Sequence, residues 1–176
     1  MSCRIGSAIA IVVAVLSTPG VLRAEQITYQ VTGLFMPERE ADLREAVAKM
    51  PAVKLVRIDY NKAEAVFDFD AKKFGKPQQA LAAFDQMLKQ ASNHTFGVKP
   101  LSTTPADKLT LIEIPVSGCD CKACSLVAYE AVYKLDGVER ATASFRAGKV
   151  TAVIDPTKTD RAKLEAALKK RGVHLK

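Results

Sequence analysis

Three cysteines lie within six residues of the sequence, in the stretch GCDCKAC: Cys119, Cys121 and Cys124. They come where an alternating apolar segment, 108–116, gives way to a segment with helical spacing, 122–135. Cysteines in such a cluster can bind a metal, exchange disulfides, or form a structural disulfide. Neighbouring cysteines close no long loop and would add little stability as a disulfide, so the spacing favours chemistry.

Cys121 and Cys124 are spaced so that both sulfurs face one point near the start of the expected helix. Unpaired backbone N–H groups and the helix dipole there favour the thiolate, which is the form that binds metal. Two soft sulfurs on an exposed loop suit a soft ion of low coordination number, such as Cu(I) or Hg(II), and they do not complete the four-ligand shell of structural zinc. We expect His174, in the last expected strand, to be an edge residue and not a ligand.

A C-x-x-C motif at a helix start is also typical of thiol–disulfide redox proteins. The thioredoxin fold, however, needs a longer βαβ architecture, and the Trp that usually precedes its first cysteine is missing, since the chain contains no Trp. A thiol–disulfide redox protein and a non-catalytic protein-interaction module with incidental cysteines therefore stay open as alternatives to metal binding.

The elements that must position these cysteines occur twice. The chain matches itself without gaps at an offset of 85 residues, so that Gly33 falls on Gly118, and Asp70 on Asp155. Identities are few, but the apolar pattern runs in phase. This indicates two copies of one supersecondary unit and not a solenoid, which needs more repeats.

Each copy has the order βαββαβ. In the second copy, strand patterns at 108–116, 138–145, 149–155 and 173–176 alternate with helical patterns at 122–135 and 159–172. The helix over 122–135 is predicted to have one apolar face, formed by Leu126, Val127, Val132 and Leu135. This order predicts an α+β fold with two tandem ferredoxin-like domains, each with a four-stranded antiparallel sheet and two helices on one face. We place the first domain at 25–99, a polar linker at 100–107 and the second domain at 108–176.

The first 24 residues have the features of a signal peptide. Arg4 precedes an uncharged apolar run, 5–16, which is too short to span a bilayer, and small residues follow up to Ala24. We expect cleavage after Ala24 and a periplasmic or secreted protein; an uncleaved membrane tether is the alternative. Cleavage would remove Cys3 and leave the three clustered cysteines.

The second copy resembles the heavy-metal-associated domain family, which includes periplasmic mercuric-ion-binding proteins, copper chaperones and the N-terminal domains of copper-exporting ATPases. The resemblance is carried by GCDCKAC, LDGVE and VTAVIDP in the second copy. It implies that Cys121 and Cys124 are metal ligands. Cys119 stands in the place of the family's Met, either as a third ligand or as a small buried side chain, and Val173 stands where an aromatic residue, Lys or His is common.

The first copy lacks the cysteines and reads as a degenerate domain of the same type. Met36 and Arg39 stand at its two ligand positions, and we expect Met36 to pack against the helix instead of binding metal with Met87 or His94. This copy is therefore expected to be structural or to present a surface.

The predicted protein is a carrier and not an enzyme. It would bind one soft ion, Cu(I) first, with Hg(II) or Zn(II) as the other candidates, and pass it on by ligand exchange. The net charge is +5 over 108–176 but +1 over 25–100, and the excess includes Lys122 and 169–171. A basic rim near the cysteines would attract an acidic partner protein. Nothing in the sequence points to nucleic acid, because aromatic residues are not interleaved with the basic ones.

Overall fold

The computed structural model describes residues 25–51, 53–117, 121–144 and 146–176. The first half contains strand β1 (Glu25–Thr32), helix α1 (Arg39–Ala48), strands β2 (Lys54–Asp59) and β3 (Glu64–Phe69), helix α2 (Pro77–Ala91) and strand β4 (Gly97–Lys99). The second half repeats this order with β5 (Thr110–Ser117), α3 (Lys122–Tyr133), β6 (Val138–Ser144), β7 (Lys149–Ile154), α4 (Arg161–Lys170) and β8 (His174–Leu175). Three short 3-10 helices lie between these elements: η1 (Tyr60–Lys62), η2 (Ala71–Phe74) and η3 (Ala106–Lys108).

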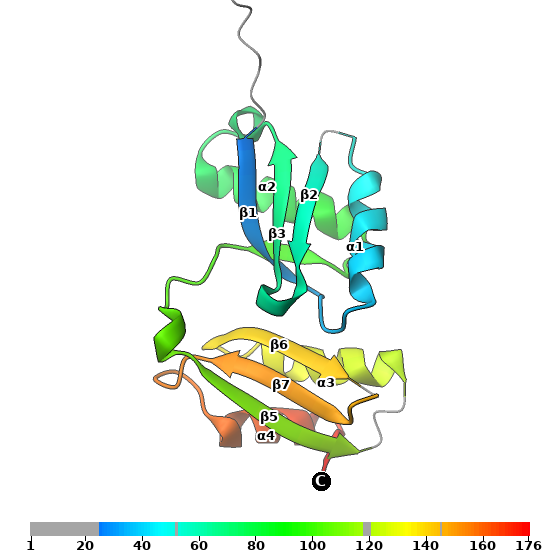
Figure 1. The fold of residues 1–176 in the computed structure, drawn as a ribbon, viewed down its shortest axis with the longest axis vertical. Coiled ribbons are helices and arrows are strands. Elements are labelled where there is room, and N and C mark those ends of the chain that lie inside the picture. The colour runs from blue at the N-terminus through cyan, green and yellow to red at the C-terminus, as the bar shows by residue number, and fades with distance from the viewer. Residues whose placement is uncertain (1–24, 52, 118–120, 145) are drawn as a thin grey trace, which may run out of the picture.

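Each half forms one antiparallel sheet, ordered β2-β3-β1-β4 in the first half and β6-β7-β5-β8 in the second. The helices of each half cover one face of its sheet (Figure 1). The predicted α+β fold with two tandem ferredoxin-like βαββαβ domains is confirmed. The cysteine segment follows β5, which lies inside its sheet, so the start of α3 is attached to a well-held strand.

Alternation along the strands decides which side chains enter the core. In β7, the buried residues are every second one, Val150, Ala152 and Ile154, because successive side chains point to opposite faces of a sheet. Helix α4 adds Leu164 and Leu168, which are spaced one turn apart and fully buried. The sheet face and the helix stripe together form the core of the second half.

The predicted apolar face of the helix after the cysteines was partly wrong. Of the four residues expected to form this face, Val132 is buried, Leu126 and Leu135 are partly buried against the core, and Val127 is 40% exposed. The buried side of α3 is instead formed by Ser125, Ala128, Tyr129, Ala131 and Val132. Tyr129, on this buried side, packs on Phe35 of the first half.

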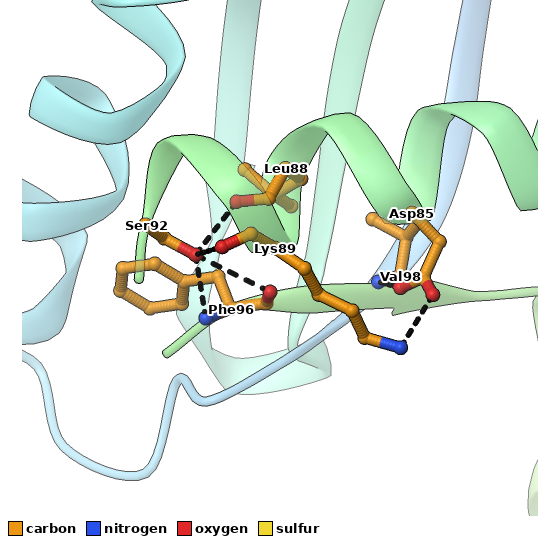
Figure 2. A network of polar contacts seen from close by, with 6 residues as sticks. All are labelled: Asp85, Leu88, Lys89, Ser92, Phe96 and Val98. Atoms are coloured by element: carbon orange, nitrogen blue, oxygen red, sulfur yellow. Dashed lines mark hydrogen bonds and ion pairs between the residues drawn. The ribbon is translucent and has the colours of Figure 1, made fainter. Parts of the chain in front are cut away.

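Strand β4 is short, and side chains of α2 hold it in place (Figure 2). Asp85 accepts a hydrogen bond from the Val98 N–H at 2.8 Å and forms an ion pair with Lys89 at 2.6 Å. Ser92 Oγ donates to the Leu88 carbonyl at 2.6 Å and accepts from the Phe96 N–H at 3.0 Å. The outer edge of β4 is therefore partly satisfied by its own helix.

The loop between β1 and α1 joins the two halves. Phe35 and Met36 are 3% and 2% exposed and belong to the hydrophobic core of the second half. The Phe35 ring lies on that of Tyr129, with centroids 5.3 Å apart. Tyr129 Oη accepts a hydrogen bond from the Gly33 N–H at 2.8 Å, and the Phe35 carbonyl accepts one from the Ala143 N–H, in β6, at 3.0 Å. The two halves are packed together, and the loop covers the outer edge of β6.

A second contact lies beside this loop. Lys99, at the end of β4, donates to the Glu139 carbonyl at 3.1 Å, and the Gln30 side-chain amide donates to the same carbonyl. Burial between the halves lowers the pKa of Lys99, while the nearby Glu139 carboxylate acts in the opposite direction. Both contacts therefore satisfy backbone groups of β6 with side chains from the first sheet.

Within the described part of the chain, no helix is long and apolar enough to cross a membrane. The predicted signal peptide, 1–24, lies outside the described residues.

Candidate metal centre

Cys121 and Cys124 meet at the N-terminal end of α3. Cys121 is the N-cap residue, with an extended backbone (φ −147°, ψ 167°), and its Sγ accepts a hydrogen bond from the Cys124 N–H at 3.4 Å. The two sulfurs are 3.2 Å apart. The thiol of Cys121 therefore takes the capping role that Ser or Asp usually has, and one orphan N–H of the helix already points at a sulfur.

The two cysteines differ in their surroundings. Cys121 is exposed, whereas Cys124 is partly buried and packs against the core of the second half. An ion in linear coordination needs its two sulfur ligands about 4.6 Å apart, because this is twice a metal–sulfur bond of about 2.3 Å. The sulfurs must therefore separate by more than an ångström to admit an ion. Cys121 is the side chain with room to make that movement.

The electrostatics at this point favour negative charge. The first turn of α3 carries the positive end of the helix dipole, and Lys122 beside Cys121 is exposed. The last turn of α4 adds Lys169 and Lys170. It lies at the same end of the domain, because β8 follows α4 directly and His174 in β8 pairs with Ser117, the last residue of β5. These basic side chains therefore lie at the same end of the second half as the two cysteines.

The third cysteine, Cys119, lies outside the described residues. Its counterpart at the 85-residue offset is Leu34, which is 1% exposed and belongs to the core of the first half. Among the described residues, no group of three or more His, Cys, Asp or Glu side chains converges on a point that could hold a metal ion.

The two other residues that the sequence singled out near this site have ordinary roles. Val173 is 7% exposed and belongs to the core of the second half, so its role is packing. His174 is exposed at the sheet edge, as expected.

The corresponding loop of the first half is buried against the second half. Met36 was expected to pack against a helix of its own domain, but it is buried in the core of the second half. Met87 packs in the core of the first half, and His94 is exposed in a turn, so Met36 and Met87 belong to different cores. Arg39 stacks over the rings of Phe35 and Phe96, at 5.4 Å and 4.9 Å from their centroids.

Sequence reasoning missed Phe35 and Tyr129 as functional contacts between the halves. The sequence does contain a pattern that could have indicated this contact. The segment GLFMP has three large apolar side chains in succession, where the second copy has its polar cysteine loop. Large apolar residues in an exposed loop indicate a contact surface.

Comparisons with protein-family models and with curated proteins found no match. Among solved structures, oxidized MerP from Ralstonia metallidurans CH34 is 25% identical and covers 39% of this chain and 94% of its own, with a TM-score of 0.37. CopZ metallochaperone is 22% identical over 38% of this chain and 100% of its own, with a TM-score of 0.37. The N-terminal soluble domains of Bacillus subtilis CopA are 20% identical, and the match covers 86% of this chain and 92% of that one, with a TM-score of 0.37. This chain is similar to these structures at low identity, and the match to the CopA domains covers most of both halves.

Proposed function

We propose that this chain is an extracytoplasmic carrier of one soft metal ion, bound as cargo between the thiolates of Cys121 and Cys124. The proposal is carried by the placement of two sulfurs 3.2 Å apart at the exposed start of α3. A helix N-terminus stabilises the thiolates that a soft ion requires. Cu(I) is the expected ion and Hg(II) the next candidate, because both accept soft sulfur ligands at low coordination number.

Release of the ion follows from the difference between the two cysteines. A partner's thiolate first bonds to the ion and gives a three-coordinate intermediate. The bond to exposed Cys121 then breaks, and a second thiolate of the partner bonds to the ion before the bond to Cys124 breaks, so that the ion keeps at least two sulfur ligands throughout. The metal keeps its charge throughout, and each departing sulfur remains a thiolate or takes a proton from water. The basic rim around the site favours an acidic partner during this exchange.

Cys119 is proposed to pack beneath the loop and not to bind the ion. The fully buried position of its counterpart Leu34 supports this assignment. A small apolar thiol suits such a position, and replacing it with Met, which is similarly apolar and flexible, should be tolerated.

The experiment uses the whole mature chain, 25–176, because Phe35 and Met36 are part of the core that supports the site. The reduced protein is titrated anaerobically with Cu(I) against a competing chelator, and native mass spectrometry counts bound ions. We expect one ion per chain, loss of tight binding in Cys121→Ser and in Cys124→Ser, and near-normal binding in Cys119→Met.

Met36→Leu is the matched control, since it removes a sulfur that is buried away from the site. Tight binding by Cys124→Ser, or loss of binding in Met36→Leu, would contradict the assignment. X-ray absorption of the Cu(I) form should show two sulfur neighbours; three in the wild type, falling to two in Cys119→Met, would make Cys119 a ligand.

Thiol–disulfide exchange is the second candidate, because the same 3.2 Å contact brings the sulfurs close to bonding distance. An insulin-reduction assay separates the two functions. A carrier should show no turnover there, whereas catalysed reduction that is lost in Cys121→Ser would favour the redox protein.

Export is proposed from the sequence of 1–24. The intact mass of the protein recovered from outside the cytoplasm should correspond to a chain that begins at Glu25. Retention of the first 24 residues would indicate a membrane tether instead.

A further inference from the structure

Within the part of the chain that the structure describes, residues 25–29 of β1 have no neighbouring strand on one side. β3 pairs with β1 over residues 25–30, but β4 pairs with it only over residues 30–32. The Val31 N–H donates to the Ala63 carbonyl, on the β3 side, so Gln30 directs its backbone groups toward β4. Alternate residues of a strand face opposite edges. The backbone groups of Gln26 and Thr28 therefore face the side that β4 does not reach.

An apolar hollow lies beside this open edge. Its volume is about 620 Å³, within the range of ligand pockets. Ile27 and Tyr29 of β1 form one wall, and Ala80 and Leu81 of α2 form the other, with Pro100 at the end of β4. The hollow thus lies on the helix side of the sheet, where every second side chain of a longer fourth strand would be buried.

Strand β4 does not extend along this edge, because it ends at Lys99 and the following residues lead toward the second half (Figure 1). The outer edge of β4 is occupied by Asp85 of α2, which accepts from the Val98 N–H (Figure 2). An added strand therefore cannot extend the sheet beyond β4 at this point. The edge of β1 at Gln26 and Thr28 is the one that offers backbone donors and acceptors.

The rim of the hollow is basic. Lys72 lines it, and Lys73 and Lys76 are exposed on the same short connection between β3 and α2. Lys73 is paired with Asp70 at 3.7 Å, whereas Lys72 and Lys76 make no ion pair with any described residue. Two positive charges beside an apolar hollow favour a ligand with an apolar group flanked by carboxylates.

We propose that this edge of the first half, defined by Gln26, Thr28, Lys72 and Leu81 around the hollow, binds an extended acidic segment of a partner polypeptide. The segment adds a strand to β1, places one apolar side chain in the hollow and directs acidic side chains to the lysines. The open backbone groups of Gln26 and Thr28 repeat at about 6.8 Å, which is the repeat of an extended peptide. This regular spacing selects a polypeptide over a small apolar molecule.

The test uses the 15N-labelled mature chain and the synthetic peptide acetyl-Asp-Val-Thr-Leu-Thr-Val-Asp-amide. Saturable NMR shifts are expected at the amides of Gln26 and Thr28, and the Thr28 amide should become protected from hydrogen exchange. The open edge of β5 provides an internal control, because Leu111 also faces a side that β8 does not reach but has no part in the hollow. Its amide should not shift.

Two matched comparisons make the result decisive. A peptide N-methylated at its Leu and the following Thr blocks both of its edges and should lose binding. Lys72→Glu, a change at an exposed side chain, should weaken binding about 2- to 5-fold, as for one surface ion pair. Absence of shifts at millimolar peptide, equal shifts at Leu111, or equal affinity for the N-methylated peptide would each overturn the proposal.

Discussion

Replacing Phe35 with alanine should weaken the second half of the chain although Phe35 belongs to the first. Its side chain is 3% exposed, stacks on Tyr129 and lies under Arg39. Removing a buried Phe side chain costs about 3–5 kcal/mol, of which the ring contact supplies about 0.5–1.5 kcal/mol. The backbone bond from Ala143 to the Phe35 carbonyl does not depend on the side chain. We therefore expect a loss of about 3 kcal/mol, at the lower end of this range.

Native-state hydrogen exchange measures this loss separately for each half. In Phe35→Ala, the amides of β6 and β7 should lose about 3 kcal/mol of protection. Phe69→Ala is the matched control, since Phe69 is 2% exposed but lies in the core of the first half. It should weaken β1 and β3 directly. Unchanged protection of β6 and β7 in Phe35→Ala would refute the reasoning, because the loop would then not be part of the second core.

A double-mutant cycle isolates the contact itself. Phe35→Ala and Tyr129→Ala should be non-additive by about 0.5–1.5 kcal/mol, the coupling of a stacked aromatic pair. Additive losses would show that the two rings contribute through separate neighbours.

Two further predictions concern the second half. Ser125 is 1% exposed, and its hydroxyl has no hydrogen-bond partner among the described residues. Ser125→Ala should therefore raise the free energy of unfolding by about 1 kcal/mol in urea titrations, with unchanged metal affinity; a loss of stability would contradict this. The Thr157 hydroxyl and then its backbone N–H lower the pKa of Asp155, with a smaller contribution from Lys158. The ionised Asp155 carboxylate therefore stabilises the folded state above the ordinary carboxyl pKa of about 3.9. This stabilisation is lost as the pH falls through the lowered pKa of the folded state. Asp155→Asn should therefore be less stable than wild type at pH 7 and approach it in acid; a constant difference in urea unfolding across pH would contradict this.

The fold was predictable because it depends on local patterns. Strand β7 alternates without interruption, and α4 has its cap at Asp160, whose side chain accepts from the Lys163 N–H at 2.9 Å, and ends in a turn before Gly172. These signals lie within a few residues of the elements they define. The 85-residue offset then supplied the second copy of the architecture, and the structure has the two sheets that it predicted.

The contact between the halves was not predictable in the same way. Met36 is apolar, and the sequence indicates correctly that it is buried, but it cannot say in which core. The predicted orientation of α3 was partly wrong for the same reason. Val127 is apolar and was predicted to face the core, but the buried side of the helix includes Tyr129, which packs on Phe35. Placement of one domain on another depends on surface shape, which has no periodic signature in the sequence.

The buried loop of the first half has a consequence for building a second metal site there. If Met36 were changed to cysteine, its thiol would stand in the core of the second half, where Met36 is 2% exposed. A partner's thiol could not reach it without separating the two halves. Cysteines at positions 36 and 39 would therefore not by themselves make an exchange site, because the contact between the halves would have to change as well.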